Sequence, residues 1–73
     1  MDMRRLVGRN ARHFRLACGL TQEQLSERSG LTQQYISGLE QGRRNPTVVT
    51  LFELAQALDT TPAALITPRG SER

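Results

Sequence analysis

The 73-residue sequence lacks the residues that define several protein classes. It has a single cysteine, Cys18, and a single histidine, His13. One cysteine cannot form an intramolecular disulfide, and with one histidine it gives no zinc-ligand set, so we expect no metal and no cofactor. No apolar run approaches the roughly 18 residues of a membrane span, and the N-terminus lacks the apolar stretch of a signal peptide. The chain is therefore predicted to be cytoplasmic, without a membrane partner.

Catalytic groups and lysine are also missing. Ser26 and Ser37 have carboxylates at helical spacing, but no nucleophile, base and orienting acid form a set, so we expect no enzyme. All ten basic residues are arginines, against seven acidic residues, which gives a net charge of +3. Arginine binds phosphate through a bidentate fork, which suits a nucleic-acid partner, although genome base composition produces the same bias.

The length indicates one small domain. A single core below about 70 to 80 residues seldom supplies more than roughly 3 to 5 kcal/mol of stability, so self-association would help. We expect the domain to span residues 1–67 and a flexible tail to span residues 68–73, where proline, glycine and serine are frequent.

Two short helices joined by a glycine are predicted between residues 21 and 42. Thr21 and Thr32 each stand between apolar residues where a helix N-cap is expected, and Gln24 can complete a capping box with Thr21. Gly30 stands where the first helix must stop, and Gly42 ends the second by the same logic, because glycine readily adopts the left-handed conformation. Two helices with such a turn are typical of a helix-turn-helix.

The second of these helices has a polar outer face. Helical periodicity places Ile36 and Leu39 inward and Gln33, Gln34 and Ser37 outward. A plain solvated face is the alternative interpretation. However, glutamine can make a bidentate pair with adenine in the major groove, and the N-terminal residues of a recognition helix contact base edges.

Three further helices complete an all-α fold. A helix near residues 4–18 is predicted from the apolar spacing of Val7, Ala11, Phe14 and Cys18. A helix that Thr47 caps is predicted from the apolar spacing of Val48, Leu51, Leu54, Ala55 and Leu58. Thr61 and Pro62 then open a short last helix that carries Leu65 and Ile66, since proline is tolerated at the first helical position.

The combined runs GLTQEQL at 19–25 and LTQQYISGLEQGRRNPT at 31–47 resemble the XRE-type helix-turn-helix family, which includes lambdoid phage repressors and Cro proteins. They also resemble restriction-modification controller proteins. The resemblance implies a compact five-helix bundle of the lambda-repressor-like type with a central helix-turn-helix. It also implies a transcriptional regulator that binds double-stranded DNA as a homodimer on a palindromic operator and blocks or recruits RNA polymerase.

The resemblance also implies roles for individual residues. Base edges are assigned to Gln33, Gln34 and Ser37, and the phosphate backbone is assigned to Gln22, Thr32, Tyr35, Arg43, Arg44 and Asn45. Gln22 is further expected to brace Gln33, while an ordinary solvated turn is the alternative for the basic loop. Arg15 and Glu40 are expected to form an ion pair. Phe52, Leu65 and Ile66 are candidates for a dimer interface, or they extend the core.

Three residues depart from the family pattern. Ser26 replaces the usual alanine and needs a hydrogen-bond partner, and Asp59 replaces a common glycine. Gly38 removes a side chain where relatives often contact DNA, so either the backbone approaches something closely or base reading is confined to Gln33, Gln34 and Ser37.

Two other functions stay open. An antitoxin would bind a toxin protein through its apolar flank and regulate its own operon. A pure interaction module would have lost DNA contact, which the glutamine pair and the arginine loop argue against.

Overall fold

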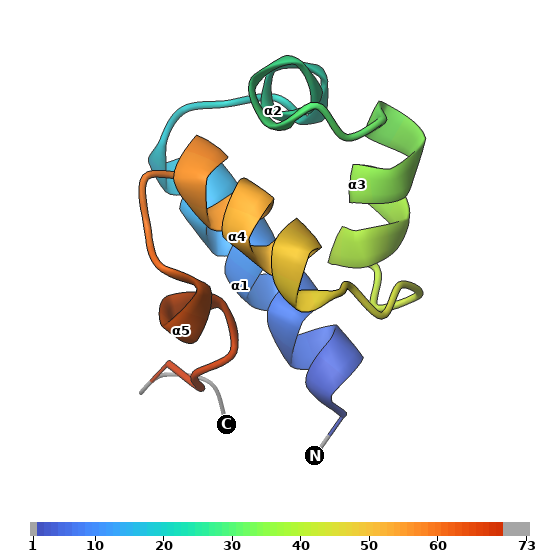
Figure 1. The fold of residues 1–73 in the computed structure, drawn as a ribbon, viewed down its shortest axis with the longest axis vertical. Helices are drawn as coiled ribbons and strands as arrows, with labels where there is room; N and C mark the ends of the chain where they lie inside the picture. The colour runs from blue at the N-terminus through green and yellow to red at the C-terminus, as the bar shows by residue number, and fades with distance from the viewer. Residues whose placement is uncertain (1, 70–73) are drawn as a thin grey trace.

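The computed structural model describes residues 2–69, and all regular structure in that range is helical. The helices are α1 (Met3–Ala17), α2 (Gln22–Ser29), α3 (Gln33–Glu40), α4 (Val48–Ala57) and α5 (Pro62–Leu65). α1 packs against α3 and α5, and α2 packs against α3 and α4 (Figure 1). None of these five helices is long and apolar enough to cross a membrane. The predicted all-α bundle with a central helix-turn-helix is confirmed.

Threonine side chains fix the starts of four helices. The N-cap residues are Thr21, Thr32, Thr47 and Thr61. Each Oγ1 accepts a hydrogen bond from the backbone N–H three residues further on, at 3.0 or 3.1 Å. Gln24 Oε1 accepts from the Thr21 N–H at 2.9 Å, which completes the predicted capping box. Since each cap is worth about 1 kcal/mol, the first turn of α3, with Gln33 and Gln34, is firmly placed.

Left-handed residues mark the predicted turns. Gly30 ends α2 with φ at +80°, and Gly42 follows α3 with φ at +79°. Asp59 has φ at +58°, a conformation that aspartate tolerates better than most residues. The turn positions expected from the sequence are therefore confirmed.

The core draws on every helix. Its buried apolar residues are Leu6, Val7, Ala11, Leu25, Ile36, Leu39, Leu54, Ala55, Ala57, Leu58 and Leu65. Phe14 and Leu51 are only partly buried and pack against this cluster. The inward side predicted for α3, Ile36 and Leu39, is confirmed.

Two residues of the predicted apolar stripes lie outside the core. Val48 is 80% exposed, since helical periodicity indicates the direction of a side chain but not whether another helix lies there. Cys18 is exposed because it follows the last residue of α1, and its Sγ donates to the Leu58 carbonyl at 3.3 Å.

A buried asparagine fastens the segment after α5 to α1. Asn10 Nδ2 donates to the carbonyl oxygens of Leu65 at 2.9 Å and Thr67 at 3.0 Å. Arg69 Nε donates to Asn10 Oδ1 at 3.1 Å. The second residue of the predicted flexible tail, Arg69, is thus hydrogen-bonded to the domain, and residues 70–73 of that tail lie outside the described residues.

Candidate nucleic-acid interface

The turn between α2 and α3 sets the angle of the two helices. Gly30 takes the left-handed conformation, and Leu31 leads into the Thr32 cap. The Ser26 hydroxyl donates to the Leu31 carbonyl, which is the hydrogen-bond partner that this residue needed. Ile36 and Leu39 anchor α3 on the core, so the opposite side of α3 faces outward.

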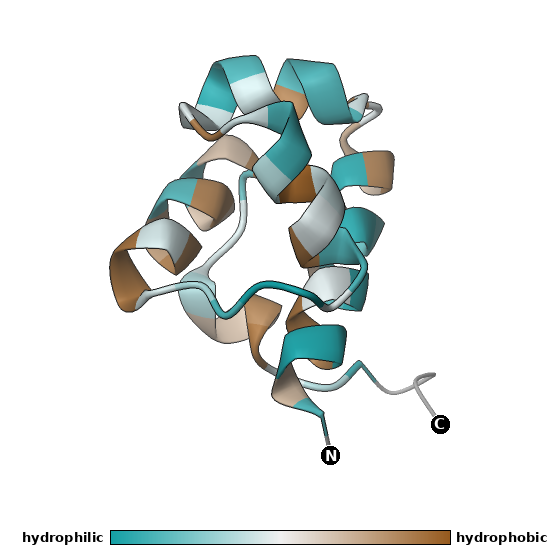
Figure 2. Cartoon of the chain, turned by 90° about the vertical axis from the view of Figure 1, so that its right-hand side faces the viewer, coloured by the Kyte–Doolittle hydropathy of each residue, from teal (hydrophilic) through white to brown (hydrophobic). Residues whose placement is uncertain are grey.

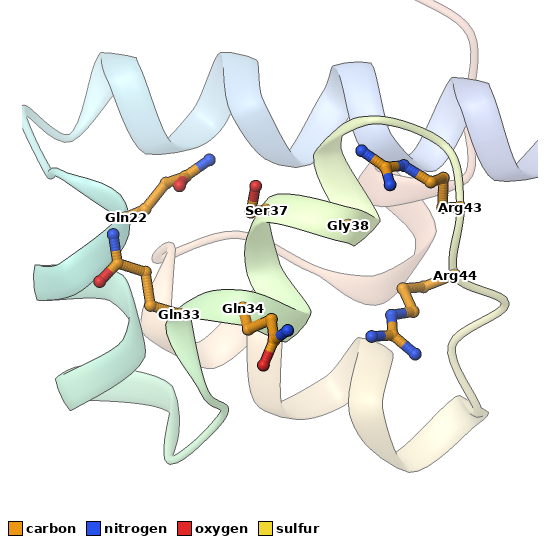
Figure 3. A pocket seen from close by; sticks show the side chains of 7 residues that line it. All are labelled: Gln22, Gln33, Gln34, Ser37, Gly38, Arg43 and Arg44. Carbon is orange, nitrogen blue, oxygen red and sulfur yellow. The ribbon is translucent and has the colours of Figure 1, made fainter.

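That outward side forms one wall of an open hollow. Its lining residues are Gln22, Gln33, Gln34, Ser37, Gly38, Arg43 and Arg44. Gln22 and Gln33 lie on one side and the arginines on the other, with Gln34, Ser37 and Gly38 between them (Figure 3). The loop after α3 is hydrophilic and runs to the apolar start of α4 (Figure 2). The hollow thus combines side-chain amides, a group that can pair with base edges, and guanidinium groups, which can pair with phosphate.

The first turn of α3 leaves its two glutamines free of the core. Gln33 and Gln34 are both exposed, and Ser37 is partly buried one turn further on. Ser37 Oγ accepts a hydrogen bond from Gln41 Nε2 at 3.3 Å. These three residues, expected to read bases, are therefore neighbours on one accessible surface.

Glu40 of α3 is hydrogen-bonded to both α1 and α2. Arg15 Nε donates to Glu40 Oε2 at 2.7 Å and Arg15 Nη2 donates to Glu40 Oε1 at 3.0 Å, the pair that the resemblance implies. The Glu40 side chain is only 4% exposed. This hydrogen-bonded partner raises the pKa of Arg15, whereas burial alone would lower it. Arg15 therefore stays charged, and α1 is fastened to α3.

The side chain of Gln22 differs from its expected arrangement. Its Nε2 donates to Glu40 Oε1 at 3.1 Å, and the expected brace on Gln33 is not formed among the described residues. The reason is that Glu40 offers a buried carboxylate, a stronger acceptor than a neutral amide. Gln22 consequently ties α2 to the same clamp as Arg15.

The arginine loop is held close to α3. The Arg44 guanidinium carbon lies 5.3 Å from the centre of the Tyr35 ring, a cation–π arrangement. A Cβ at Gly38 would lie 3.1 Å from Arg44 Nε, so the missing side chain leaves room for this arginine. Arg43 donates to the Gln41 side-chain oxygen. Of the two features considered for Gly38, the structure therefore shows a close approach, which is that of the Arg44 side chain to the Gly38 backbone.

Three other residues that are predicted to contact the DNA phosphate backbone do not line the hollow. Thr32 is exposed and caps α3, and Asn45 is exposed in the loop. Tyr35 is partly buried and packs against the core.

The candidate dimer residues divide into two groups. Phe52 is 52% exposed and Ile66 is 44% exposed, so both are available on the surface. Leu65 is fully buried, which corrects its assignment to an interface: as the last residue of α5 it faces α1 and α4, so it extends the core.

Sequence reasoning missed two residues that hold the helices together, of which Gly8 positions the site. Gly8 lies where α1 crosses the end of α3, and a Cβ there would lie 2.9 Å from the Glu40 carbonyl oxygen and closer still to that of Leu39. A glycine inside a helical pattern indicates such an approach. Asn10, buried beside Ala11, is a polar residue on the apolar stripe of α1, which indicates a hydrogen bond within the fold.

Comparison with known proteins gives a family and several relatives. The helix-turn-helix family model matches residues 12–65. The HTH-type transcriptional regulator y4dJ of Sinorhizobium fredii is 60% identical over 93% of this chain and 88% of its own. The control protein C.SmaI of Serratia marcescens is 43% identical over 96% of this chain and 83% of its own.

A solved structure of similar fold contains DNA. It is the tetramer of the restriction-modification controller protein C.Esp1396I in complex with its natural 35 base-pair operator. It is 31% identical, covers 89% of this chain and 86% of its own, and has a TM-score of 0.81.

Proposed function

This chain belongs to the helix-turn-helix family and is a DNA-binding transcriptional regulator, and from that premise we propose how it reads its operator. α3 enters the major groove, and Gln33 and Gln34 contact base edges there with Ser37 beside them. The exposed glutamine pair in the capped first turn of α3 supports this assignment most directly. Each good bidentate pair is worth about 1 to 3 kcal/mol of discrimination against a wrong base.

The phosphate backbone is bound on both sides of the hollow. Arg43, Arg44 and Asn45 contact it from the loop, with Tyr35 holding the Arg44 guanidinium in place. Thr32 and Gln22 contact it from the starts of α3 and α2. Gln22 uses one N–H of its amide for Glu40 and keeps the other for a phosphate oxygen.

Two copies of the chain bind a palindromic operator. In a two-fold dimer the recognition helices lie about one DNA turn apart, roughly 34 Å. Phe52 and Ile66, both exposed and apolar, form the candidate interface. Dimerisation also offsets the small core of a domain of this size.

A controller or repressor role fits best among the functions considered. C.Esp1396I is named a restriction-modification controller and C.SmaI a control protein, which favours this role over the antitoxin alternative. Such a regulator works in the cytoplasm beside the chromosome and has no catalytic activity of its own. Occupancy of the operator blocks or recruits RNA polymerase.

Selection of binding sites from a random duplex pool, at two salt concentrations, tests the proposal. The wild-type protein should enrich a palindrome. Gln33→Ala should relax the base preference at one position of each half-site by about 1 to 3 kcal/mol and leave the salt dependence nearly unchanged. An unchanged base preference would refute the reading role of Gln33.

Arg43→Ala serves as the comparison variant in the same selection. It should weaken binding to all sequences alike and lower the slope of log affinity against log salt by about one unit. Retention of the full slope would remove Arg43 from the phosphate-binding set.

A further inference from the structure

The first turn of α1 lies directly against the end of α3. A Cβ at Gly42 would lie 2.9 Å from Arg5 Cγ and 3.3 Å from Arg5 Cα. The aliphatic part of the Arg5 side chain therefore packs against Gly42, the residue that precedes Arg43. We propose that Arg5 binds a DNA phosphate next to those bound by the loop, so that the phosphate-binding surface continues onto α1. This inference rests on the proposed mode of DNA binding.

A second hollow adjoins the first at this point. It is lined by Arg5, Arg9, Glu40 and Gln41. Gln41 connects the two hollows. Its side chain is hydrogen-bonded to Arg43 and Ser37, which line the first hollow, and it lines the second hollow beside Arg5. The N-terminal half of α1 passes beside Arg43 in Figure 3. The surface of Arg5 is thus continuous with that of the predicted DNA contacts.

Arginines are prominent in both hollows beside the end of α3. Arg43 and Arg44 line the first hollow, and Arg5 and Arg9 line the second together with Glu40. The bidentate bond from Arg15 already neutralises Glu40. Arg5 therefore stands in a local field that favours an anion such as a phosphate.

The position of Arg5 on the duplex follows from the orientation of α3. Gln33 and Gln34 start the helix in the groove, whereas its end and the following loop reach the rim, where a backbone strand passes. Arg5 adjoins that end and lies away from the glutamines. It is therefore placed to meet the sugar-phosphate strand and not a base edge.

Arg5→Gln tests the proposal, with Arg4→Gln as the matched control. Both variants remove one charge from an exposed arginine in the first turn of α1, but Arg4 does not line the hollow. Affinity for the selected duplex is measured between 50 and 200 mM salt. The loss of one phosphate contact lowers the slope of log affinity against log salt by about 0.9. Over this range of salt, the loss of affinity should therefore be about threefold smaller for Arg5→Gln than for the wild type. Arg4→Gln should keep the wild-type slope.

Phosphate ethylation interference then locates the contact. Ethylation of one phosphate at the edge of each half-site should weaken the wild type and Arg4→Gln but no longer affect Arg5→Gln. Arg5→Lys, which keeps the charge, should keep the slope. Urea unfolding of each variant shows whether Arg5 acts instead by stabilising the end of α3.

The outcomes separate the two proposals. Equal slopes for Arg5→Gln and Arg4→Gln, with wild-type binding intact, overturn the role of Arg5 alone. A loss of stability in Arg5→Gln with no change of slope or interference overturns it too. A wild-type protein that binds no selected duplex overturns this inference together with the proposed mode of reading.

Discussion

Gly8 and Gly38 both lie inside helices, but their neighbours give them different roles. Beside Gly8 stand the backbone carbonyls of Leu39 and Glu40, which cannot move without shifting α3. Beside Gly38 stands the flexible side chain of Arg44, which can move. One glycine therefore positions the recognition helix, and the other leaves space for a loop arginine.

Gly8→Ala should destabilise the protein by about 2 kcal/mol or more, because overpacking costs about 1 to 3 kcal/mol and the clash here is with backbone. The gain of roughly 1 kcal/mol in helix propensity should not compensate for it. Urea unfolding measures the change.

Gly38→Ala is the matched control. It should gain up to about 1 kcal/mol of stability from helix propensity, since Arg44 needs to shift by only a few tenths of an ångström. Equal stabilities of the two variants would contradict the close approach of α1 and α3.

At the scale of elements, one buried carboxylate links α1, α2 and α3, in addition to the apolar packing of the helix-turn-helix on the core. Glu40 accepts hydrogen bonds from Arg15 on α1 and from Gln22 on α2. Gly8 allows α1 to lie close enough for this clamp to form. The orientation of α3, and with it the direction of the glutamines, depends on these contacts between helices.

Arg15→Met should cost about 3 to 5 kcal/mol, because it leaves Glu40 buried without its cationic partner. A loss of that size approaches the whole stability of a domain this small, so the variant should be largely unfolded at 37 °C. Circular dichroism during thermal unfolding measures it.

Arg12→Met, an exposed arginine on the same helix, is the control and should stay close to the wild type. A stable Arg15→Met variant would show that the clamp is dispensable. In that case apolar packing alone would hold α3 in place.

At the scale of the whole molecule, an apolar surface remains uncovered on the described chain. Phe52 on α4 and Ile66 after α5 are about half exposed, whereas Leu54 and Leu65 of the same two helices are fully buried. In a protein with so small a core, covering them would add to stability. We assign them to the contact between two copies.

Phe52→Lys should therefore shift the protein from dimer to monomer, because a charge at an apolar contact must be desolvated. Sedimentation velocity measures the state, and affinity for the palindrome should fall with it. Leu16→Lys, at a similarly exposed leucine on α1, should leave the dimer intact. A monomeric wild type, or a dimer that tolerates Phe52→Lys, would place the interface elsewhere.

The sequence alone was enough for the features that depend on near neighbours. The threonine caps and the left-handed glycines bond to residues a few positions away, so Thr21, Thr32 and Gly30 identified the two helices and their turn. The period of α3 likewise separated Ile36 and Leu39 from Gln33 and Gln34. These local rules already placed an amide pair on an outward helix face.

Only the tertiary structure decided what depends on residues far apart in the chain. Val48 and Leu65 fit their helical stripes equally well, yet one is exposed and the other buried, because neighbouring helices cover α5 and not the first turn of α4. The Gln22 bond to Glu40 and the Asn10 bonds to the end of α5 join segments 18 and 55 residues apart. Periodicity indicates where a side chain points, but the packing of the whole chain determines what it meets.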